Sequence, residues 1–210
     1  MPLCARCTGT YLGALLGFTT LWALGKGRAS NMPPPKALAF LAGFIILMAI
    51  DGLNSYLAFF PDLPRLYRPS NTLRLITGTL NGLALSIIIY PILNLTLWRN
   101  PATKRVLDGL HELSVPLVLD ALLILIVRTE VGSLLYPLAI LSAVGVLLLL
   151  TVVNTLIIVI LTRQEGQAAT LRDAFPLLLS GLAATILEIG AIILVRGRMS
   201  WMPPASVRYW

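Results

Sequence analysis

The sequence predicts an all-α membrane protein, a bundle of about six transmembrane helices that forms a single domain over residues 1–210. Of these residues 57% are hydrophobic and 12% are charged, whereas a soluble globular domain carries roughly 25% charged residues. The hydrophobic residues are gathered into six stretches with polar links between them, and each stretch approaches the roughly 20 apolar residues that cross a bilayer. The lipid bilayer is therefore the first partner that the sequence predicts.

The formal net charge of +7 does not indicate a nucleic-acid partner. The basic residues occur singly or in pairs between the apolar stretches, which is typical of anchoring to lipid headgroups and of setting orientation in a membrane. A nucleic-acid site would instead gather lysine and arginine on one face. We therefore expect no nucleic acid among the partners.

The predicted helices begin and end at prolines, glycines and polar links. Asn71 opens the third helix as an N-cap type of residue, and the polar stretch 99–112 is expected to form a short interfacial helix. The tail 196–210 carries tryptophan, tyrosine and arginine and is expected to lie in the headgroup zone. The motif-bearing half is 1–98 and the hydrophobic second half is 113–195. The six predicted helices cover residues 8–24, 36–60, 71–98, 113–127, 133–161 and 171–195.

Glycines repeat at every fourth position on two of these helices. Gly9, Gly13 and Gly17 lie on one face of the first helix, and Gly78 with Gly82 lies on one face of the third. This small-x-x-x-small spacing lets helix backbones approach closely in a membrane. A further interpretation uses the same faces to dock the protein against a larger membrane complex.

With six spans, the amino terminus, the links after helices two and four and the carboxyl tail share one membrane face, here called side A. The opposite face is side B. The bias of basic residues favours side B as the cytoplasmic side. Its links carry Lys26, Arg28, Lys36, Arg99, Lys104, Arg105, Arg163 and Arg172.

Alternation of the spans also predicts which polar groups share a depth. Asp51 lies fifteen residues into helix two, about 22 Å from side B at a rise of about 1.5 Å per residue, and Glu188 lies as far along helix six. Arg74 is about one turn into helix three, and Cys4 and Cys7 stand where helix one starts. We therefore expect these five groups in one shallow layer near side A.

Charged residues inside spanning segments cost several kcal/mol unless they are paired or hydrated. Asp51 and Arg74 are expected to pair, either as a structural tie between helices two and three or as part of a functional site. Glu188 is expected to pair with Arg128 or Arg74. Asp120, within helix four, has no obvious partner in the sequence.

Cys4 and Cys7 are the two cysteines of the chain, and their i, i+3 spacing places them on one helical face. The helix amino terminus and Arg6 favour the thiolate form. Three interpretations stay open: half of a metal site for zinc or iron, a redox-active dithiol, and two thiols without chemistry. A closed zinc site needs four ligands, so a metal would have to recruit Asp51, Glu188 or another polypeptide.

Aromatic residues at the predicted helix ends, Tyr67 and Trp98 among them, are expected to form an interfacial belt.

The motif Cys4-Ala5-Arg6-Cys7-Thr8-Gly9, followed by Asp51-Gly52 and by Asn71 with Arg74 and Thr77-Gly78, resembles a family of prokaryotic integral membrane proteins. This is the domain of unknown function 2085 family, and the resemblance covers roughly residues 2–82. It implies a multi-pass protein of the prokaryotic cytoplasmic membrane and supplies no activity. The signature residues it implies are Cys4, Arg6, Cys7, Asp51, Asn71, Arg74 and Thr77.

Members of that family usually carry a further Cys-His pair in a segment before CARCTG, whereas this sequence has Met1 directly upstream of the motif. With such a segment, a Cys-His pair and Cys-x-x-Cys would make a four-ligand metal site. Without the segment, the metal interpretation weakens.

Three functional hypotheses follow. The first is a polar site at Cys4 and Cys7 that binds a metal or exchanges electrons, with Asp51 and Arg74 orienting the layer. The second is an accessory subunit of a larger membrane complex or a homo-oligomer. The third is a small carrier in which Asp120 and Glu188 move protons, ions or solutes.

Overall fold

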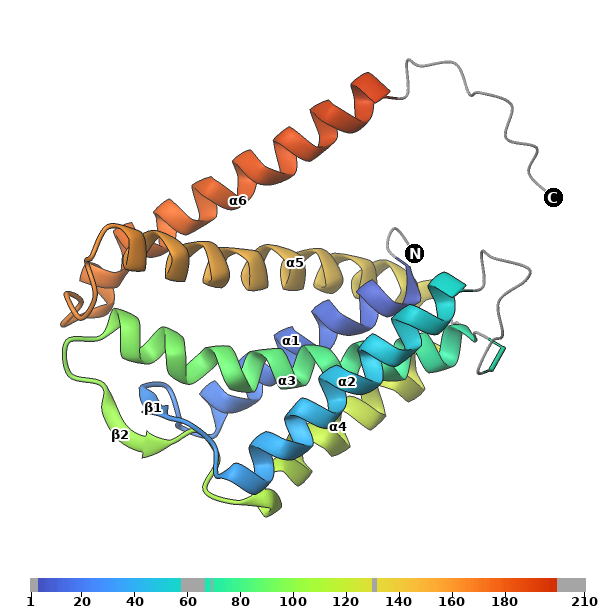
Figure 1. Cartoon of the computed structure of the whole chain (residues 1–210), viewed down its shortest axis with the longest axis horizontal. Helices are drawn as coiled ribbons and strands as arrows, with labels where there is room; N and C mark the ends of the chain where they lie inside the picture. The colour runs from blue at the N-terminus through green and yellow to red at the C-terminus, as the bar shows by residue number, and fades with distance from the viewer. Residues whose placement is uncertain (1–3, 58–66, 69, 130–131, 200–210) are drawn as a thin grey trace.

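The computed structural model describes residues 4–57, 67–68, 70–129 and 132–199, which form six helices and two short strands. Figure 1 shows the helices gathered as a bundle, with α6 leaning away from the others. The predicted all-α bundle is confirmed. In chain order the elements are α1 (Ala5–Ala23), β1 (Ala29–Asn31), α2 (Pro35–Leu57), α3 (Asn71–Leu97), β2 (Ala102–Arg105), α4 (Leu110–Arg128), α5 (Gly132–Leu161) and α6 (Leu171–Met199).

Five of the helices in the described ranges, α2 to α6, are long and apolar enough to cross a membrane. The remaining helix, α1, was predicted as the first span. It has 19 residues, nine of them buried, and several of these are threonine or glycine. Because α1 packs mainly against α3, much of its surface meets protein, where small residues permit close packing.

The contact between α1 and α3 depends on the glycines of both helices. A Cβ atom added to Gly9 would stand 2.6 Å from the carbonyl oxygen of Leu75 and 2.9 Å from the amide nitrogen of Thr79. One added to Gly78 would overlap the backbone carbonyl of Arg6. The predicted close approach of helix backbones is therefore confirmed. The glycine faces of α1 and α3 pack against each other, so they are not exposed for docking to a larger complex.

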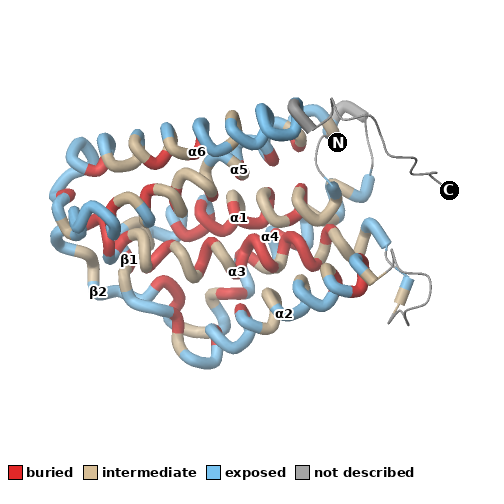
Figure 2. Tube along the Cα trace, turned by 45° about the horizontal axis from the view of Figure 1, so that its top comes forward, coloured by how far each residue is buried: buried red, intermediate tan, exposed pale blue. Residues whose placement is uncertain are grey.

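The buried core lies along the same two helices. Figure 2 shows the buried positions gathered along α1 and α3, while α2 and α6 are largely exposed. Leu83 and Ile87 of α3 and Leu21 of α1 are almost completely buried, whereas Ile46 of α2 and Leu187 of α6 are exposed. Large apolar side chains on outer helices are expected where the surroundings are lipid.

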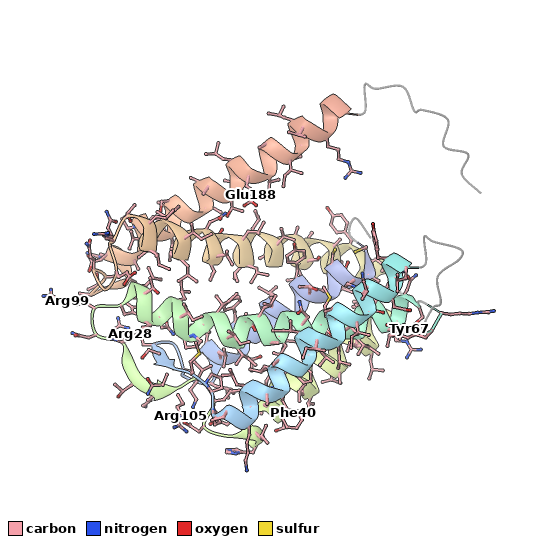
Figure 3. The ribbon with its side chains drawn as sticks, viewed as in Figure 1. Arg28, Phe40, Tyr67, Arg99, Arg105 and Glu188 are labelled. Atoms are coloured by element: carbon pink, nitrogen blue, oxygen red, sulfur yellow. The ribbon has the colours of Figure 1, made fainter. Side chains whose placement is uncertain are left out.

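The polar stretch 99–112 does not form the predicted interfacial helix. It contains β2, which pairs in parallel with β1, with Ala29 opposite Ala102. Pro101 lacks an amide donor and Gly109 weakens a helix, so the segment between them is extended before α4 begins. The pairing joins the α1–α2 and α3–α4 links, and Figure 3 shows Arg28, Arg99 and Arg105 at this end of the bundle.

Several helix boundaries differ slightly from the sequence prediction. Ser70, not Asn71, is the N-cap of α3, and its side chain accepts a hydrogen bond from the Leu73 amide at 3.2 Å. Serine caps as well as asparagine does, so the cap lies one residue earlier, while α3 begins at Asn71 as predicted. α6 continues to Met199 into the predicted interfacial tail, and residues 58–60 and 200–210 lie outside the described ranges.

Candidate functional site

The two cysteines stand at the amino terminus of α1. Cys4 is the N-cap residue, and its Sγ accepts a hydrogen bond from the amide of Cys7 at 3.3 Å. The Sγ atoms of the two residues lie 2.8 Å apart, and both thiols are free. Cys4 is exposed and Cys7 is half-buried. The Cys4 thiol is therefore accessible to a reacting molecule, and the Cys7 thiol is less accessible.

The surroundings of Cys4 favour its thiolate. Partial burial acts to raise the pKa of the Cys4 thiol, but hydrogen bonds from the side chain and amide of Cys7, together with the charge of Arg6, outweigh burial and lower the pKa. The amino end of a helix and a neighbouring cation are the features that activate cysteines elsewhere.

Arg6, between the cysteines, is anchored to α2. Its Nε donates to Oδ2 of Asp51 at 3.1 Å, and its Nη2 forms an ion pair with the same oxygen. Nη2 also donates to the backbone carbonyl of Asp51 at 3.1 Å and to Oγ of Ser55 at 2.9 Å. The Asp51 side chain is 1% exposed, so its charge needs these partners.

Two further hydroxyl groups complete the surroundings of Asp51. Tyr67 donates to Oδ1 at 2.8 Å. The Thr77 hydroxyl of α3 lies 3.4 Å from Oδ2 and also donates to the backbone carbonyl of Leu73 at 3.0 Å. Burial, followed by the hydrogen bond to Asp51, raises the pKa of the Tyr67 hydroxyl, which keeps it a donor. Arg6, Asp51, Ser55, Tyr67 and Thr77, here called the Asp51 cluster, tie α1, α2 and α3 together at one end. Figure 3 shows Tyr67 at the end opposite the strands.

Arg74 does not pair with Asp51 as predicted. In the described ranges the ion-pair partner of Asp51 is Arg6, and the Nε of Arg74 is buried without a hydrogen-bond partner. Arg6 already neutralises the carboxylate through Oδ2, and Tyr67 donates to Oδ1, so the charge of Asp51 needs no second guanidinium. The expected shallow layer thus keeps Cys4, Cys7 and Asp51, with Arg6 in the role assigned to Arg74.

The other predicted site residues lie outside this cluster. Glu188 is exposed on α6, and it accepts from Nδ2 of Asn154 at 3.2 Å instead of pairing with Arg128 or Arg74. Figure 3 shows it along α6, away from Tyr67. Asn71 is exposed in the first turn of α3. Asp120 is 1% exposed on α4.

The described residues do not supply a complete metal centre. Nowhere in the described ranges do three or more histidine, cysteine, aspartate or glutamate residues gather in a group that could hold a metal ion. Asp51, which was expected to be recruited, is committed to Arg6. Cys4 and Cys7 therefore offer two sulfur ligands, half of what a closed zinc site needs.

Sequence reasoning missed Ser55 and misplaced Tyr67. Ser55 follows Asp51 by four residues on α2, so the two share a helical face, and that spacing was a usable signal. Tyr67 was expected in an aromatic belt, and nothing in its sequence neighbourhood points to Asp51. Trp98 was expected there too, but it is 8% exposed, with the guanidinium carbon of Arg28 4.4 Å from its ring centroid.

Comparison with known proteins covers the part of the chain that holds this site. No curated protein and no solved structure matches the chain. Residues 1–89 match the model of the family described as predicted membrane protein (DUF2085), which confirms the resemblance that the CARCTG and NxxRxxTG motifs predicted.

Proposed function

We propose that Cys4 and Cys7 are a redox-active dithiol at one face of this membrane protein, and that the dithiol reduces a disulfide of a partner molecule. The observation that carries the proposal is the 2.8 Å separation of the two Sγ atoms at the start of α1. Two sulfurs this close need only small side-chain movements to form a disulfide.

The two thiols differ in the way that such chemistry needs. Cys4 is the exposed N-cap with a lowered pKa, and the thiolate is the attacking species in thiol–disulfide exchange. Cys7 is less exposed and lies within α1. Cys4 is thus suited to attack an incoming disulfide, and Cys7 is suited to resolve the product.

The reaction has two steps. The Cys4 thiolate attacks one sulfur of the partner disulfide, the partner S–S bond breaks, and a Cys4–partner mixed disulfide forms as the other partner sulfur leaves as a thiolate. Cys7 passes its proton to the partner thiolate released in the first step, and the Cys7 thiolate then attacks Sγ of Cys4 and releases the second partner sulfur. The chain loses two electrons and two protons, and the partner disulfide gains them and becomes two thiols.

The Asp51 cluster supports this role by fixing Arg6. The guanidinium of Arg6 is held by hydrogen bonds to Asp51 and Ser55. Its positive charge therefore keeps a fixed position beside the thiols. Asp51 belongs to the cluster as a positioning residue, because it acts on Cys4 through Arg6.

Metal binding has less support. Zinc or iron at Cys4 and Cys7 would need ligands beyond those that the described residues gather. The subunit hypothesis was based on exposed glycine faces. Those faces of α1 and α3 pack against each other, so they no longer support a role as a complex subunit.

The test is a redox titration of the protein purified in mild detergent. Samples are equilibrated with oxidised and reduced dithiothreitol at stepped ratios, free thiols are alkylated, and the mass shift is read by mass spectrometry. We expect Cys4 and Cys7 to lose reactivity together with a two-electron dependence. Cys7→Ser should accumulate a mixed disulfide at Cys4 when a small disulfide is added, and Cys4→Ser should not.

Two outcomes would count against the proposal. Thiols that stay reduced at every ratio, or that titrate independently, would exclude a dithiol–disulfide couple. Near-stoichiometric zinc or iron in the purified protein, lost in the double variant Cys4→Ser with Cys7→Ser, would favour metal binding instead.

A further inference from the structure

The helix α4 touches the rest of the bundle along one narrow stripe. Its buried residues are Leu113, Pro116 and Asp120, at the i, i+3, i+7 spacing of a single helical face. Exposed apolar side chains such as Val118 and Leu122 cover the other faces. Asp120 therefore lies on the buried face of α4, where packing alone would favour an apolar or small side chain.

The carboxyl group of Asp120 has no hydrogen-bond partner in the described part of the chain. Its side chain is 1% exposed, and both Oδ atoms are buried and unpaired. Thr79 of α3 is the polar neighbour that interacts with it. The Thr79 hydroxyl donates to the backbone carbonyl of Ile76 at 3.0 Å, so its proton is already used.

Charged groups on the helices packed against α4 do not compensate Asp120. Arg6 of α1 and Asp51 of α2 are paired with each other, and Arg74 of α3 forms no ion pair in the described ranges. In the described ranges Asp120 takes part in no ion pair. A structural ion pair, the usual reason for a charge in a bundle, is thus not what holds Asp120 there.

An ionised carboxylate in these surroundings costs several kcal/mol. A bound metal cation would need several oxygen ligands around it, and the described residues gather no group of three or more acidic, histidine or cysteine ligands. A proton needs only the carboxyl group itself. The ligand that fits the site is therefore a proton.

We propose that Asp120 is a proton-binding site inside the membrane-spanning part of the bundle, and that its proton exchanges with water. Pro116 lies one turn before Asp120 on the same stripe. Its ring removes a backbone hydrogen bond of α4 at that level, which loosens the helix beside the site. The site is independent of the dithiol at the start of α1.

The test measures the protonated carboxyl group directly. Infrared spectra of the purified protein in lipid vesicles are recorded from pH 5 to pH 10, for the wild type and for Asp120→Asn, which keeps the shape but has no titratable group. We expect a protonated-carboxyl C=O band in the wild type at pH 5 to 6 that declines as pH rises and is missing in the variant.

Labelling with dicyclohexylcarbodiimide gives a second readout. This apolar reagent adds a protonated carboxyl group across its C=N bond, so it should modify Asp120 in the lipid-embedded protein and the modification should fall at high pH. Asp108→Asn, which removes an exposed acid outside the spans, should label as the wild type does.

Three results would overturn the proposal. Wild type and Asp120→Asn could show identical bands and labelling, which would mean that Asp120 is ionised throughout. The band could persist unchanged to pH 10, which would mean that the proton does not exchange. The carbodiimide could modify wild type and Asp120→Asn equally, which would place the reactive acid elsewhere; thermal unfolding of both proteins in the same detergent checks that the variant is folded.

Discussion

Arg6 of α1 and Asp51 of α2 form an ion pair in which the aspartate side chain is 1% exposed and the arginine side chain 20%. The carboxylate belongs to α2, and α1 and α3 contribute Arg6 and Thr77 to its surroundings. The pair is thus both a tie between helices and the support of the residue that lies between the two cysteines.

Replacing Asp51 by asparagine should destabilise the protein. The variant removes the negative charge and replaces one of the two acceptor oxygens by an amide NH2, so either the guanidinium of Arg6 or the hydroxyl of Tyr67 loses its acceptor. Losing a partner of a buried polar group costs about 1–3 kcal/mol. Thermal or denaturant unfolding in detergent measures the change. The matched control is Glu188→Gln, because Glu188 is exposed and accepts one hydrogen bond from Asn154; it should change stability by less. Equal effects would contradict a structural role for the Asp51 cluster.

The α1–α3 contact predicts opposite outcomes for two glycine-to-alanine changes. Gly9→Ala would place a methyl group 2.6 Å from the Leu75 carbonyl oxygen, which belongs to rigid backbone, and overpacking of this kind costs about 1–3 kcal/mol. Gly43→Ala on α2 meets no atom within 4 Å and should be neutral or slightly stabilising, since alanine is the better helix former. Unfolding of both variants in one detergent gives the comparison. A tolerated Gly9→Ala would mean that the two helices are farther apart than described.

The sequence was sufficient for the helices and for the meeting of α1, α2 and α3 at one end of the bundle, and insufficient for the pairing of side chains there and for the position of Glu188. Apolar length and the four-residue glycine repeat are local properties, so they predicted the helices and a close helix approach at each glycine face. They did not predict that the glycine faces of α1 and α3 meet each other. Alternation of spans placed the start of α1, the end of α2 and the start of α3 at one face. Which guanidinium reaches Asp51 depends on side-chain direction and on rotation about each helix axis, and depth alone does not determine either.

The same distinction explains the two strands. The stretch 99–112 has the polar composition of an interfacial helix, but its partner is β1, more than 70 residues earlier in the chain. A parallel pairing between two links of the same membrane face leaves no short-range pattern in the sequence. Tyr67 was misplaced for a similar reason, because an aromatic residue at a helix end suits both an interfacial belt and a buried hydrogen bond.

Asn94 should be essential for the junction between α3 and the strands. Its Nδ2 donates to the backbone carbonyl of Ala29 at 2.9 Å, and its Oδ1 accepts from Nε1 of Trp98 at 3.0 Å. Asn94→Leu would leave both buried groups unpaired and should cost about 2–6 kcal/mol, from about 1–3 for each. Trp98→Phe removes a single hydrogen-bond donor. The lost hydrogen bonding should therefore lower the free energy of unfolding by less than in Asn94→Leu. Unfolding of the two variants in detergent tests this order, and an unaffected Asn94→Leu would contradict it.

The pH dependence of thiol alkylation should report the environment of Cys4. Because its pKa is lowered, Cys4 should react with iodoacetamide at a lower pH than an ordinary thiol, since the thiolate is the reacting form. Cys7→Ala removes the side-chain hydrogen bond that favours this thiolate, and Arg6→Gln removes its positive neighbour, so both variants should shift the rate profile of Cys4 to higher pH.

Ser55→Ala separates the charge of Arg6 from its anchoring. It removes one acceptor of the guanidinium and leaves the ion pair with Asp51 in place, so the shift in the Cys4 profile should be smaller than that of Arg6→Gln. Peptide mass spectrometry of timed alkylation reactions resolves Cys4 from Cys7 in each variant. If Arg6→Gln and Ser55→Ala gave the wild-type profile, the charge held by the Asp51 cluster would have no influence on the thiol, and Asp51 would be a structural tie between helices without a positioning role at Cys4.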